Sequence, residues 1–249
     1  MFLTKRYFDV VSEDVAWAIA YDIAVPFAGV TLRYREMTST GIAGPRWNMR
    51  LRRADAPAHF RFSDIGATWT DERPAPEAYF DNDVLTWRLT QLRSRVVVET
   101  NSHFFEGLGY GETLTLKCAP WLLGIRELWW GRYLSAQTFL TWIIADGNIP
   151  IRFGVHDRLS TSAVAINEST ISIGEASLHI GEERCRIASG DVFAGRPRLA
   201  LLASRVMGGR GLAIRQDKAI YQATVSAGCG RESGLAVAEH VVFGPLLGC

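Results

Sequence analysis

Side chains alternate between large and small from residue 15 to residue 25, and this alternation constrains the fold of the 249-residue chain most strongly. The large members are Val15, Trp17, Ile19, Tyr21, Ile23 and Val25, and the positions between them are Ala16, Ala18, Ala20, Asp22 and Ala24. Successive residues of a β-strand point to opposite faces of a sheet, whereas a helix repeats about every 3.6 residues. The segment is therefore predicted to be a strand, although its alanines favour a helix.

Segments with strand-like composition continue to the end of the chain. In the first part they include residues 47–53, 58–62, 65–70, 84–92 and 95–105. The last two of these are expected to form a hairpin with a short turn. Later segments include residues 109–117, 126–135, 138–145, 151–155, 177–180, 184–188, 219–227 and 235–243. Many short strands separated by turns favour closure into a barrel or sandwich, because closure removes exposed sheet edges.

The chain is accordingly expected to be all-β, with a barrel-like architecture. A boundary after residue 106 gives an N-terminal β half of residues 1–106 and a C-terminal β half of residues 107–249. One continuous domain is the alternative, because all-β domains reach this length as single units.

Charge and composition exclude several classes of partner. The 27 Lys and Arg residues balance 26 Asp and Glu residues, so no strong field would attract nucleic acid. The longest apolar stretch, residues 15–30, contains Asp22 and Pro26 and is too short to span a bilayer, so no stable membrane insertion is expected. The cysteines are too far apart in sequence for a zinc knuckle or a disulfide framework: Cys118, Cys185, Cys229 and Cys249. They suit a reducing cytoplasm, which is the expected location.

The segment from residue 107 to residue 116 carries the strongest candidate for chemistry. In a strand, Tyr110 and Glu112 share one face with two leucines, so Glu112 is expected to point inward. A buried carboxyl without a cation has a raised pKa, as a general acid near neutral pH requires. The alternative is a structural ion pair between Glu112 and an arginine. The spacing Gly-x-Gly-x-Gly, followed by a strand, does not fit a dinucleotide loop.

A second candidate region is rich in indoles. Alternation places Glu127, Trp129 and Tyr133 on one face of a strand and Trp130 and Arg132 on the other. Further indoles flank this strand at Trp121 and Trp142. Such aromatic side chains either fill a core or line a ligand cavity, and both interpretations remain open.

The histidines give a weaker signal. His103 precedes two phenylalanines at the end of an expected strand and is a candidate acid or base, or alternatively a surface residue. No spacing of His, Asp or Glu indicates a metal, and no Gly-x-Ser-x-Gly motif indicates a nucleophile. We therefore expect no metal and no cofactor.

Five short motifs together resemble the lipocalin-like (calycin) superfamily of carotenoid hydratases of the hydroxyneurosporene synthase type, which includes tocopherol cyclase-like proteins and natural-product pericyclases. They are Gly109-Tyr110-Gly111-Glu112, Pro120-Trp121, Arg126-Glu127-Leu128, Trp130-Gly131-Arg132 and Trp142-Ile143. The resemblance covers chiefly residues 107–146, with a fainter echo at residues 7–14. It implies a lipocalin-like β-barrel architecture, with two consecutive calycin-like halves packed together around an elongated apolar cavity.

The resemblance also implies roles for individual residues. Glu112 would be the acid, Tyr110 its hydrogen-bonding neighbour, and Arg132 or Arg126 would orient a polar end of the substrate. The indoles would form the cavity wall: Trp121, Trp129, Trp130 and Trp142.

The function expected from residues and resemblance together is that of a cofactor-independent enzyme. It would cyclise, isomerise or hydrate a hydrophobic polyene, polyketide or terpenoid inside an apolar cavity. The alternatives are a non-catalytic carrier of a hydrophobic small molecule and an interaction module with a solid core. A homodimer is left open.

Overall fold

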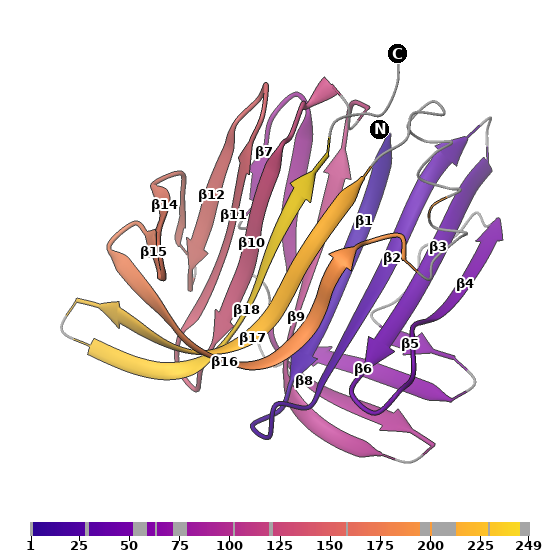
Figure 1. The fold of residues 1–249 in the computed structure, drawn as a ribbon, viewed down its shortest axis with the longest axis horizontal. Helices are drawn as coiled ribbons and strands as arrows, with labels where there is room; N and C mark the ends of the chain where they lie inside the picture. The colour runs from indigo at the N-terminus through magenta and orange to yellow at the C-terminus, as the bar shows by residue number, and fades with distance from the viewer. Residues whose placement is uncertain are drawn as a thin grey trace. The chain divides into compact units, whose positions relative to one another are not determined.

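The protein consists of two compact units, an N-terminal unit of Met1–Cys118 and a C-terminal unit of Ala119–Cys249 (Figure 1). The structure, a computed structural model, describes residues 2–27, 30–51, 59–62, 64–71, 79–101, 103–119, 122–157, 159–194, 200, 213–228 and 230–244. Among these residues the regular elements are eighteen strands. No helix in this part of the chain is long and apolar enough to cross a membrane.

The N-terminal unit contains a single antiparallel sheet in the order β4-β3-β2-β1-β9-β8-β6-β5, with β7 also paired to β8. The strands are β1 (Leu3–Val11), β2 (Trp17–Phe27), β3 (Val30–Ser39), β4 (Arg46–Leu51), β5 (His59–Arg61), β6 (Ile65–Asp71), β7 (Tyr79–Asp81), β8 (Leu85–Thr100) and β9 (Phe104–Leu116). The first strand lies between β2 and β9, so the beginning and the end of this unit pair directly.

One core of this unit forms where the coiled sheet folds back on itself. Phe8 of β1 packs against Trp69 of β6, with ring centroids 5.3 Å apart. The Trp69 indole also donates a hydrogen bond to the backbone oxygen of Asp9 over 2.9 Å. The buried cluster around this contact consists of Phe8, Val10, Ala18, Ala20, Met37, Ile65, Ala67, Trp69, Val96 and Val98. The members of this cluster on β1, β2 and β3 occupy one face of those strands, so the opposite face is available for other chemistry.

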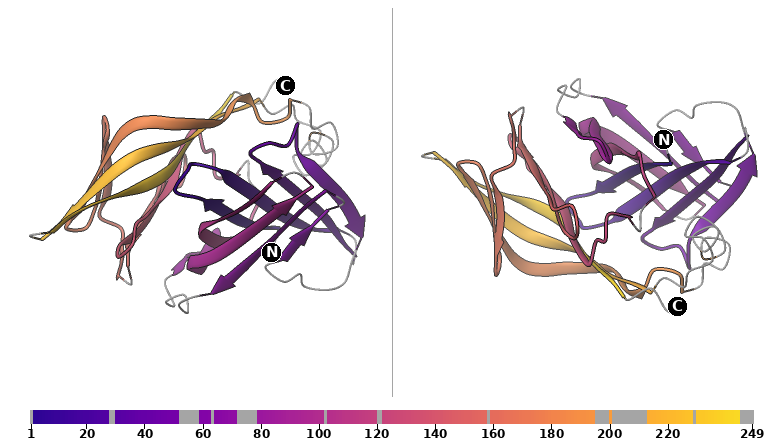
Figure 2. Two further views of the ribbon diagram at one scale, coloured as in Figure 1. Left: turned by 90° about the horizontal axis from the view of Figure 1, so that it is seen from below. Right: turned by 90° about the horizontal axis from the view of Figure 1, so that it is seen from above.

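The C-terminal unit contains a second antiparallel sheet, in the order β13-β12-β11-β10-β18-β17-β16-β15-β14. The strands are β10 (Glu127–Leu134), β11 (Phe139–Asp146), β12 (Ile151–His156), β13 (Leu159–Thr161), β14 (Val164–Asn167), β15 (Thr170–Ile173), β16 (Ala176–Asp191), β17 (Ile214–Ala227) and β18 (Gly230–Phe243). The views in Figure 2 show this sheet curling strongly along its width.

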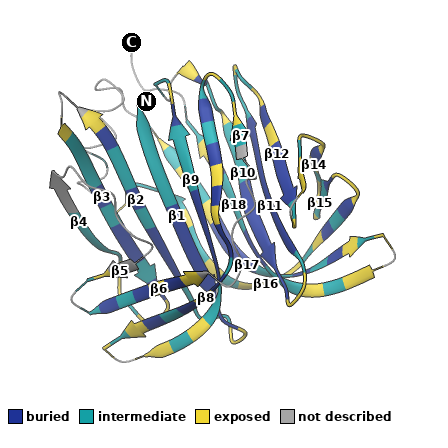
Figure 3. Cartoon of the chain, turned by 180° about the vertical axis from the view of Figure 1, so that it is seen from behind, coloured by how far each residue is buried: buried dark blue, intermediate teal, exposed yellow. Residues whose placement is uncertain are grey.

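The core of the C-terminal unit joins strands from distant parts of its sheet. Val164 of β14 and Ile173 of β15 belong to the same buried cluster as Leu140 and Trp142 of β11, so the sheet is nearly closed. Figure 3 shows the resulting burial, which is almost complete along β11, whereas β16 is exposed over much of its length. This enclosed interior confirms the predicted all-β, barrel-like architecture.

The alternation at residues 15–25 correctly predicted β2, but the predicted hairpin of residues 84–92 and 95–105 is wrong. Residues 85–100 form one continuous strand, β8, and its partner is β9. Two irregularities in register, between Leu89 and Gln91 and between Gln91 and Ser94, shift the alternation of buried residues within β8. Such bulges change the phase of the alternation of buried residues without ending the strand. The resulting sequence pattern therefore resembles that of two strands joined by a turn.

The expected division after residue 106 falls within β9, which runs to Leu116. The chain instead passes from one compact unit to the other between Cys118 and Ala119. The complete β9 strand is needed in the N-terminal unit because it pairs with both β1 and β8.

Gly131 on β10 has no room for a side chain. A Cβ atom at this position would lie 2.2 Å from Cζ2 of the buried Trp142 and 2.7 Å from the backbone oxygen of Val237. We expect Gly131→Ala to lower the free energy of unfolding by about 3 kcal/mol, because a buried indole and a sheet backbone cannot both move aside. Urea unfolding measures the change. Gly230→Ala is the matched control, since its nearest neighbouring atom would be 3.5 Å away, and an equal loss there would contradict the packing argument.

Candidate functional site

Glu112 lies on β9 and is buried, with 5% of its surface exposed. Its Oε2 atom accepts two hydrogen bonds, one from Nε1 of Trp87 over 2.6 Å and one from the Tyr110 hydroxyl over 2.7 Å. Both donors are themselves almost completely buried. Strand geometry explains the arrangement, because Tyr110 and Glu112 are two residues apart on one face and Trp87 comes from the adjacent strand β8. The structure thus brings Glu112 and Tyr110 together as the sequence predicted.

Apolar side chains also lie beside Glu112. Leu89 of β8 is directly opposite Glu112 in the register, and Leu114 follows Glu112 on the same face of β9. Burial favours the protonated form of a carboxyl, whereas donated hydrogen bonds favour the carboxylate. Both of the hydrogen bonds described above end on Oε2.

The same face of the sheet repeats the tyrosine and acid arrangement on β1. Tyr7 is opposite Glu112 and Asp9 is opposite Tyr110 in the register of β1 with β9. The Tyr7 hydroxyl donates to Oδ2 of Asp9 over 2.8 Å, and Asp9 is 1% exposed. The rings of Tyr7 and Tyr110 are 6.4 Å apart. Two buried acids therefore lie diagonally across two neighbouring strands, each with a tyrosine from its own strand.

A third copy of the arrangement lies on β3. The Tyr34 hydroxyl donates to Oε2 of Glu36, and both residues are 2% exposed. The register continues from Glu36 through Tyr21 to Tyr7, so all three pairs share one face. We call this the acid face, and its members are Tyr7, Asp9, Tyr34, Glu36, Tyr110 and Glu112. Sequence reasoning missed the first two pairs, although the recurring spacing Tyr-x-Asp or Tyr-x-Glu was visible.

The glycines beside Glu112 have a packing role. A Cβ atom at Gly109 would lie 2.3 Å from Cγ2 of Val96 and 2.9 Å from the backbone oxygen of Asp9. Glycine therefore allows β9 to lie close to β8 and β1. This close packing accounts for a glycine at position 109 within a strand.

His103 does not lie with Glu112. It is exposed and occupies the turn between β8 and β9, where its backbone accepts a hydrogen bond from the Thr100 amide over 2.8 Å. Nine residues separate it from Glu112 along extended chain, a distance of about 30 Å at roughly 3.3 Å per residue. The two side chains cannot act on the same reacting atom, and His103 is therefore not included in the candidate site.

The indoles of the C-terminal unit do not form one wall. Trp142 is 1% exposed and belongs to the core cluster, against which the half-buried Trp129 also packs. Trp130 and Arg132 point to the opposite face of β10 and are buried there. The predicted alternation along β10 is thus observed, and it separates the tryptophans instead of gathering them. Trp121 lies outside the described residues.

The face that carries Trp130 also holds a buried ion pair. Nζ of Lys218 on β17 is 2.6 Å from Oε2 of Glu239 on β18, and the two side chains are 1% and 11% exposed. Nζ also lies 5.0 Å from the centre of the Trp130 ring. The amide of Gln216 donates to Oε1 of Glu239 over 2.7 Å. No local sequence pattern indicates this group, because its members come from three strands and meet only through the register.

Glu127 lies at the opposite face of β10 with Trp129 and His240. The Trp129 and His240 rings are stacked, with centroids 4.8 Å apart and planes 9° apart. Nε2 of His240 is 3.8 Å from Oε2 of Glu127, and both side chains are partly exposed. The arrangement connects Glu127 to a histidine that the sequence analysis did not single out.

Tyr133 illustrates how burial acts on a titratable group in this unit. Desolvation raises its pKa from 10.0 to about 12, and its hydroxyl donates to the backbone oxygen of Glu232 over 3.0 Å. The folded protein therefore keeps the phenol proton at a pH where the unfolded chain releases it.

The raised pKa of Tyr133 is expected to contribute to the free energy of unfolding in full below pH 10. This contribution should decrease as the pH rises from 10 to about 12. Urea unfolding of the wild type and of Tyr133→Phe at about pH 9 and about pH 11.5 measures this. The stability advantage of the wild type over the variant should shrink at the higher pH, and a constant advantage would contradict the assignment.

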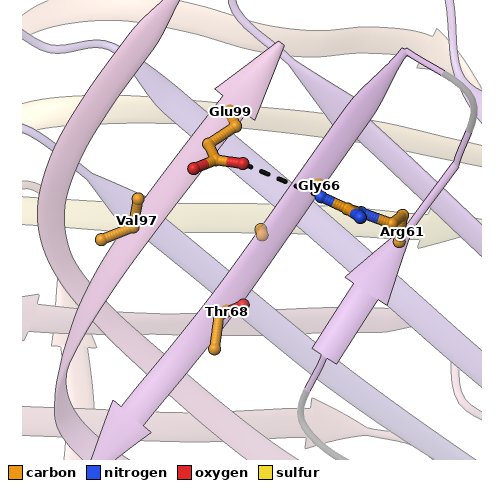
Figure 4. Close-up of a pocket in the computed structure, with 6 residues that line it drawn as sticks. Arg61, Gly66, Thr68, Val97 and Glu99 are labelled. Carbon is orange, nitrogen blue, oxygen red and sulfur yellow. Dashed lines mark ion pairs between the residues drawn. The ribbon is translucent and has the colours of Figure 1, made fainter.

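The volume of one hollow on the N-terminal unit can be compared with the volume that a ligand needs. It is lined by Arg61, Gly66, Ala67, Thr68, Val97 and Glu99, and Arg61 pairs with Glu99 across it at 3.9 Å (Figure 4). Its volume of about 80 Å³ is well below the roughly 300 Å³ that a drug-sized ligand needs. Within the described part of the chain, no group of three His, Cys, Asp or Glu residues could hold a metal ion.

Comparisons with known proteins identify the fold. No protein-family model matches the chain, and no curated protein matches its sequence. The alignment with a solved structure of CghA covers 96% of this chain and 88% of the CghA chain, with 8% identity and a TM-score of 0.61. CghA with Sch210972 gives the same coverage and identity and a TM-score of 0.59. A protein described as an ATTH from Nitrosomonas europaea covers 96% of this chain and 92% of its own, with 9% identity and a TM-score of 0.57.

These neighbours share the lipocalin-like fold that the resemblance implied, and at 8–9% identity the similarity shows the fold alone. The similarity extends over nearly the whole chain and includes both β halves. The resemblance predicted from the motifs is confirmed at the level of the fold.

Proposed function

We propose that this protein is a cofactor-independent enzyme that cyclises, isomerises or hydrates a hydrophobic polyene, polyketide or terpenoid intermediate. The observation that carries this proposal is the buried Glu112 carboxyl, whose Oε2 accepts hydrogen bonds from Trp87 and Tyr110. A carboxyl held by two fixed donors among leucines is oriented to transfer a proton to an apolar substrate.

Each neighbour of Glu112 has a part in this proposal. Trp87 and Tyr110 fix the rotamer of the acid through hydrogen bonds to Oε2. Leu89 and Leu114 supply apolar surface for a hydrocarbon chain beside the acid. Protonation of a carbon–carbon double bond then leaves a cation that closes a ring, loses another proton or takes up water. Tyrosine and tryptophan faces stabilise such a cation through their π systems.

The C-terminal unit is proposed to supply further substrate contacts through side chains of β10. Trp130 and Arg132 share one buried face, and Arg132 is proposed to bind a polar oxygen of the substrate. Glu127 and Trp129 offer a second, more exposed contact surface on the other face. Trp142 supports Trp129 from within the core, and Trp121 is proposed as a further wall residue from the sequence resemblance.

One argument favours an enzyme over a carrier, and a second supports binding of a small molecule. A buried carboxyl costs free energy even when two donors satisfy one of its oxygens, and a general acid has a use for this costly group that a carrier does not require. The fold is also one for which a structure of CghA with Sch210972 exists, which supports a role in accommodating a compound of this general kind.

Two experiments test the proposal. Bound compounds are extracted from one sample of the purified protein, and a second sample is incubated with acyclic polyenes of several lengths. An enzyme should yield a mass-neutral product or a product heavier by one water, as seen by mass spectrometry. A carrier would return every bound compound unchanged, and that outcome would replace the enzymatic proposal with the carrier interpretation.

A further inference from the structure

Lys5 on β1 carries a half-buried ammonium group that the proposed function does not use. It lies two residues before Tyr7 on a regular strand, so its side chain points to the acid face. Nζ of Lys5 is 5.1 Å from the centre of the Tyr21 ring on β2 and 5.9 Å from that of Tyr7. The two rings are 5.4 Å apart. Because the π face of an aromatic ring attracts a cation, this pair of tyrosines holds the Lys5 side chain in place.

The ammonium group is not neutralised by a carboxylate of the part of the chain that the structure describes. There Lys5 forms no ion pair, and its side chain donates no hydrogen bond. Glu112 on the same face is instead bonded to Trp87 and Tyr110. A contact with an aromatic ring leaves the charge of a lysine and its three N–H donors in place. Lys5 can therefore still bind an anion.

Apolar side chains flank Lys5 on both sides. In the register, Leu114 of β9 lies opposite Lys5 on one side, and Ile23 of β2 lies opposite it on the other. Both are half-buried, and Trp87 of β8 is opposite Leu114 in turn. Sites for small molecules are mostly apolar, with a few polar groups that fix the orientation of the ligand. The surroundings of Lys5 thus suit a ligand that has a hydrocarbon chain and an anionic end.

The register also places Lys5 close to the proposed acid. Since Lys5 is opposite Leu114, Glu112 occupies the diagonal position on β9. Diagonal positions on paired strands lie about 7–8 Å apart at the backbone. Tyr7, one of the two rings that hold Lys5, is directly opposite Glu112. One small molecule on this face can therefore reach both the ammonium group and the acid.

We infer that Lys5 binds the anionic end of the substrate, a carboxylate or enolate oxygen. The hydrocarbon chain then lies along Leu114, and the reacting double bond is held at Glu112. This inference rests on the proposed function and narrows its substrates to polyenes that carry an acidic group. Lys5 takes no part in proton transfer, because Glu112 supplies the proton and the ammonium group stays charged throughout.

Calorimetric titration of the wild type tests the inference without turnover. The probes are a conjugated decadienoic acid and the decadienol of the same chain, which differ in charge at one end only. Near neutral pH the acid should bind about tenfold more tightly than the alcohol. This preference should shrink as salt is raised from about 0.05 M to about 0.5 M, because salt screens a partly exposed ion pair. Equal affinities, or no binding of the acid, would overturn the inference.

Substitution of Lys5 assigns the preference to one side chain. Lys5→Met keeps a long unbranched side chain and removes the charge, so it should weaken binding of the acid about tenfold and change binding of the alcohol less than about twofold. Lys5→Arg should restore most of the preference. Lys117→Met is the matched control, since Lys117 is paired with Asp81 at the surface, and it should bind both probes as the wild type does.

Two further outcomes would contradict the role of Lys5. A preference for the acid that survives in Lys5→Met would show that another group binds the anion. Loss of the preference in Arg93→Met, with retention in Lys5→Met, would assign the anion to the half-buried Arg93 of β8.

The same titrations separate this inference from the proposed function. Glu112→Gln should keep the preference for the acid, because the change removes the proton donor and not the ammonium group. A clear preference in a protein that converts no polyene would support Lys5 as the anion-binding residue of a carrier and remove only the proposed enzyme. Turnover of polyenes without any preference for the acid would keep the enzyme and overturn the role of Lys5.

Discussion

Replacing Glu112 with glutamine is expected to lower kcat by about 10²–10⁴-fold, the range that a positioned general acid contributes. Glutamine keeps the size of the side chain and an oxygen that can accept the hydrogen bonds of Trp87 and Tyr110. It cannot donate a carboxylic proton. Binding of the substrate should therefore change little, and the loss should appear in kcat and not in KM. Steady-state kinetics on any polyene that the wild type converts provide the measurement.

The control for this variant comes from the same strand. Glu106 on β9 is exposed and pairs with Arg95, so Glu106→Gln makes the same chemical change at an exposed position six residues from Glu112. It should leave kcat within about twofold of the wild type, because surface ion pairs contribute little. Full residual turnover in Glu112→Gln would remove the acid role. An equal loss in both variants would point to an effect on folding, which unfolding measurements would reveal.

The sequence predicted the local features of this site and not its partners. Alternation was sufficient to place Tyr110 and Glu112 on one inward face, because a strand fixes the direction of side chains two residues apart. Asp9 of the acid face is about a hundred residues away, and only the register of β1 with β9 brings it beside Tyr110. Register depends on the pairing of whole strands, and a single sequence does not encode it in any local pattern.

The indoles show a different limit of sequence reasoning. Alternation correctly separated Trp129 from Trp130 across β10, but both faces of that strand carry buried residues. When both faces are apolar, periodicity does not tell which one is the core. The structure resolves this through Trp142, which lies opposite Gly131 and fills the space that the missing side chain leaves in the core. The glycine itself was the signal, because a glycine inside a strand often marks a close approach.

Bulges account for the wrong hairpin in the N-terminal unit. Within β8 the buried positions change from Leu85, Trp87 and Leu89 to Ser94, Val96 and Val98, so the apolar pattern changes phase. A change of phase in the apolar pattern can mean either a turn or a bulge with inserted residues. The two alternatives differ in whether the segment keeps the same neighbouring strand on both sides of the change. Here β9 continues past the irregularity, which keeps β8 in one piece and allows Trp87 to reach Glu112.

The second large effect is expected at the buried ion pair of the C-terminal unit. Glu239→Gln should lower the free energy of unfolding by about 3–5 kcal/mol, because it leaves the charge of the buried Lys218 without its carboxylate. Lys218→Met combined with Glu239→Gln should be less destabilising than Glu239→Gln alone, since no buried ammonium then remains. Urea unfolding of the wild type, both single variants and the double variant gives the coupling energy directly.

The exposed pair of Arg95 and Glu106 is the reference for this cycle, and its coupling should be within about 1 kcal/mol. A Lys218 and Glu239 coupling as small as that value would mean that burial adds nothing to the pair. A large coupling would instead show that the face carrying Trp130 is dry enough to strengthen electrostatic interactions. That dryness is the property on which recognition of a polar substrate oxygen by Arg132 depends, so this cycle measures the environment of the proposed binding face independently of any substrate.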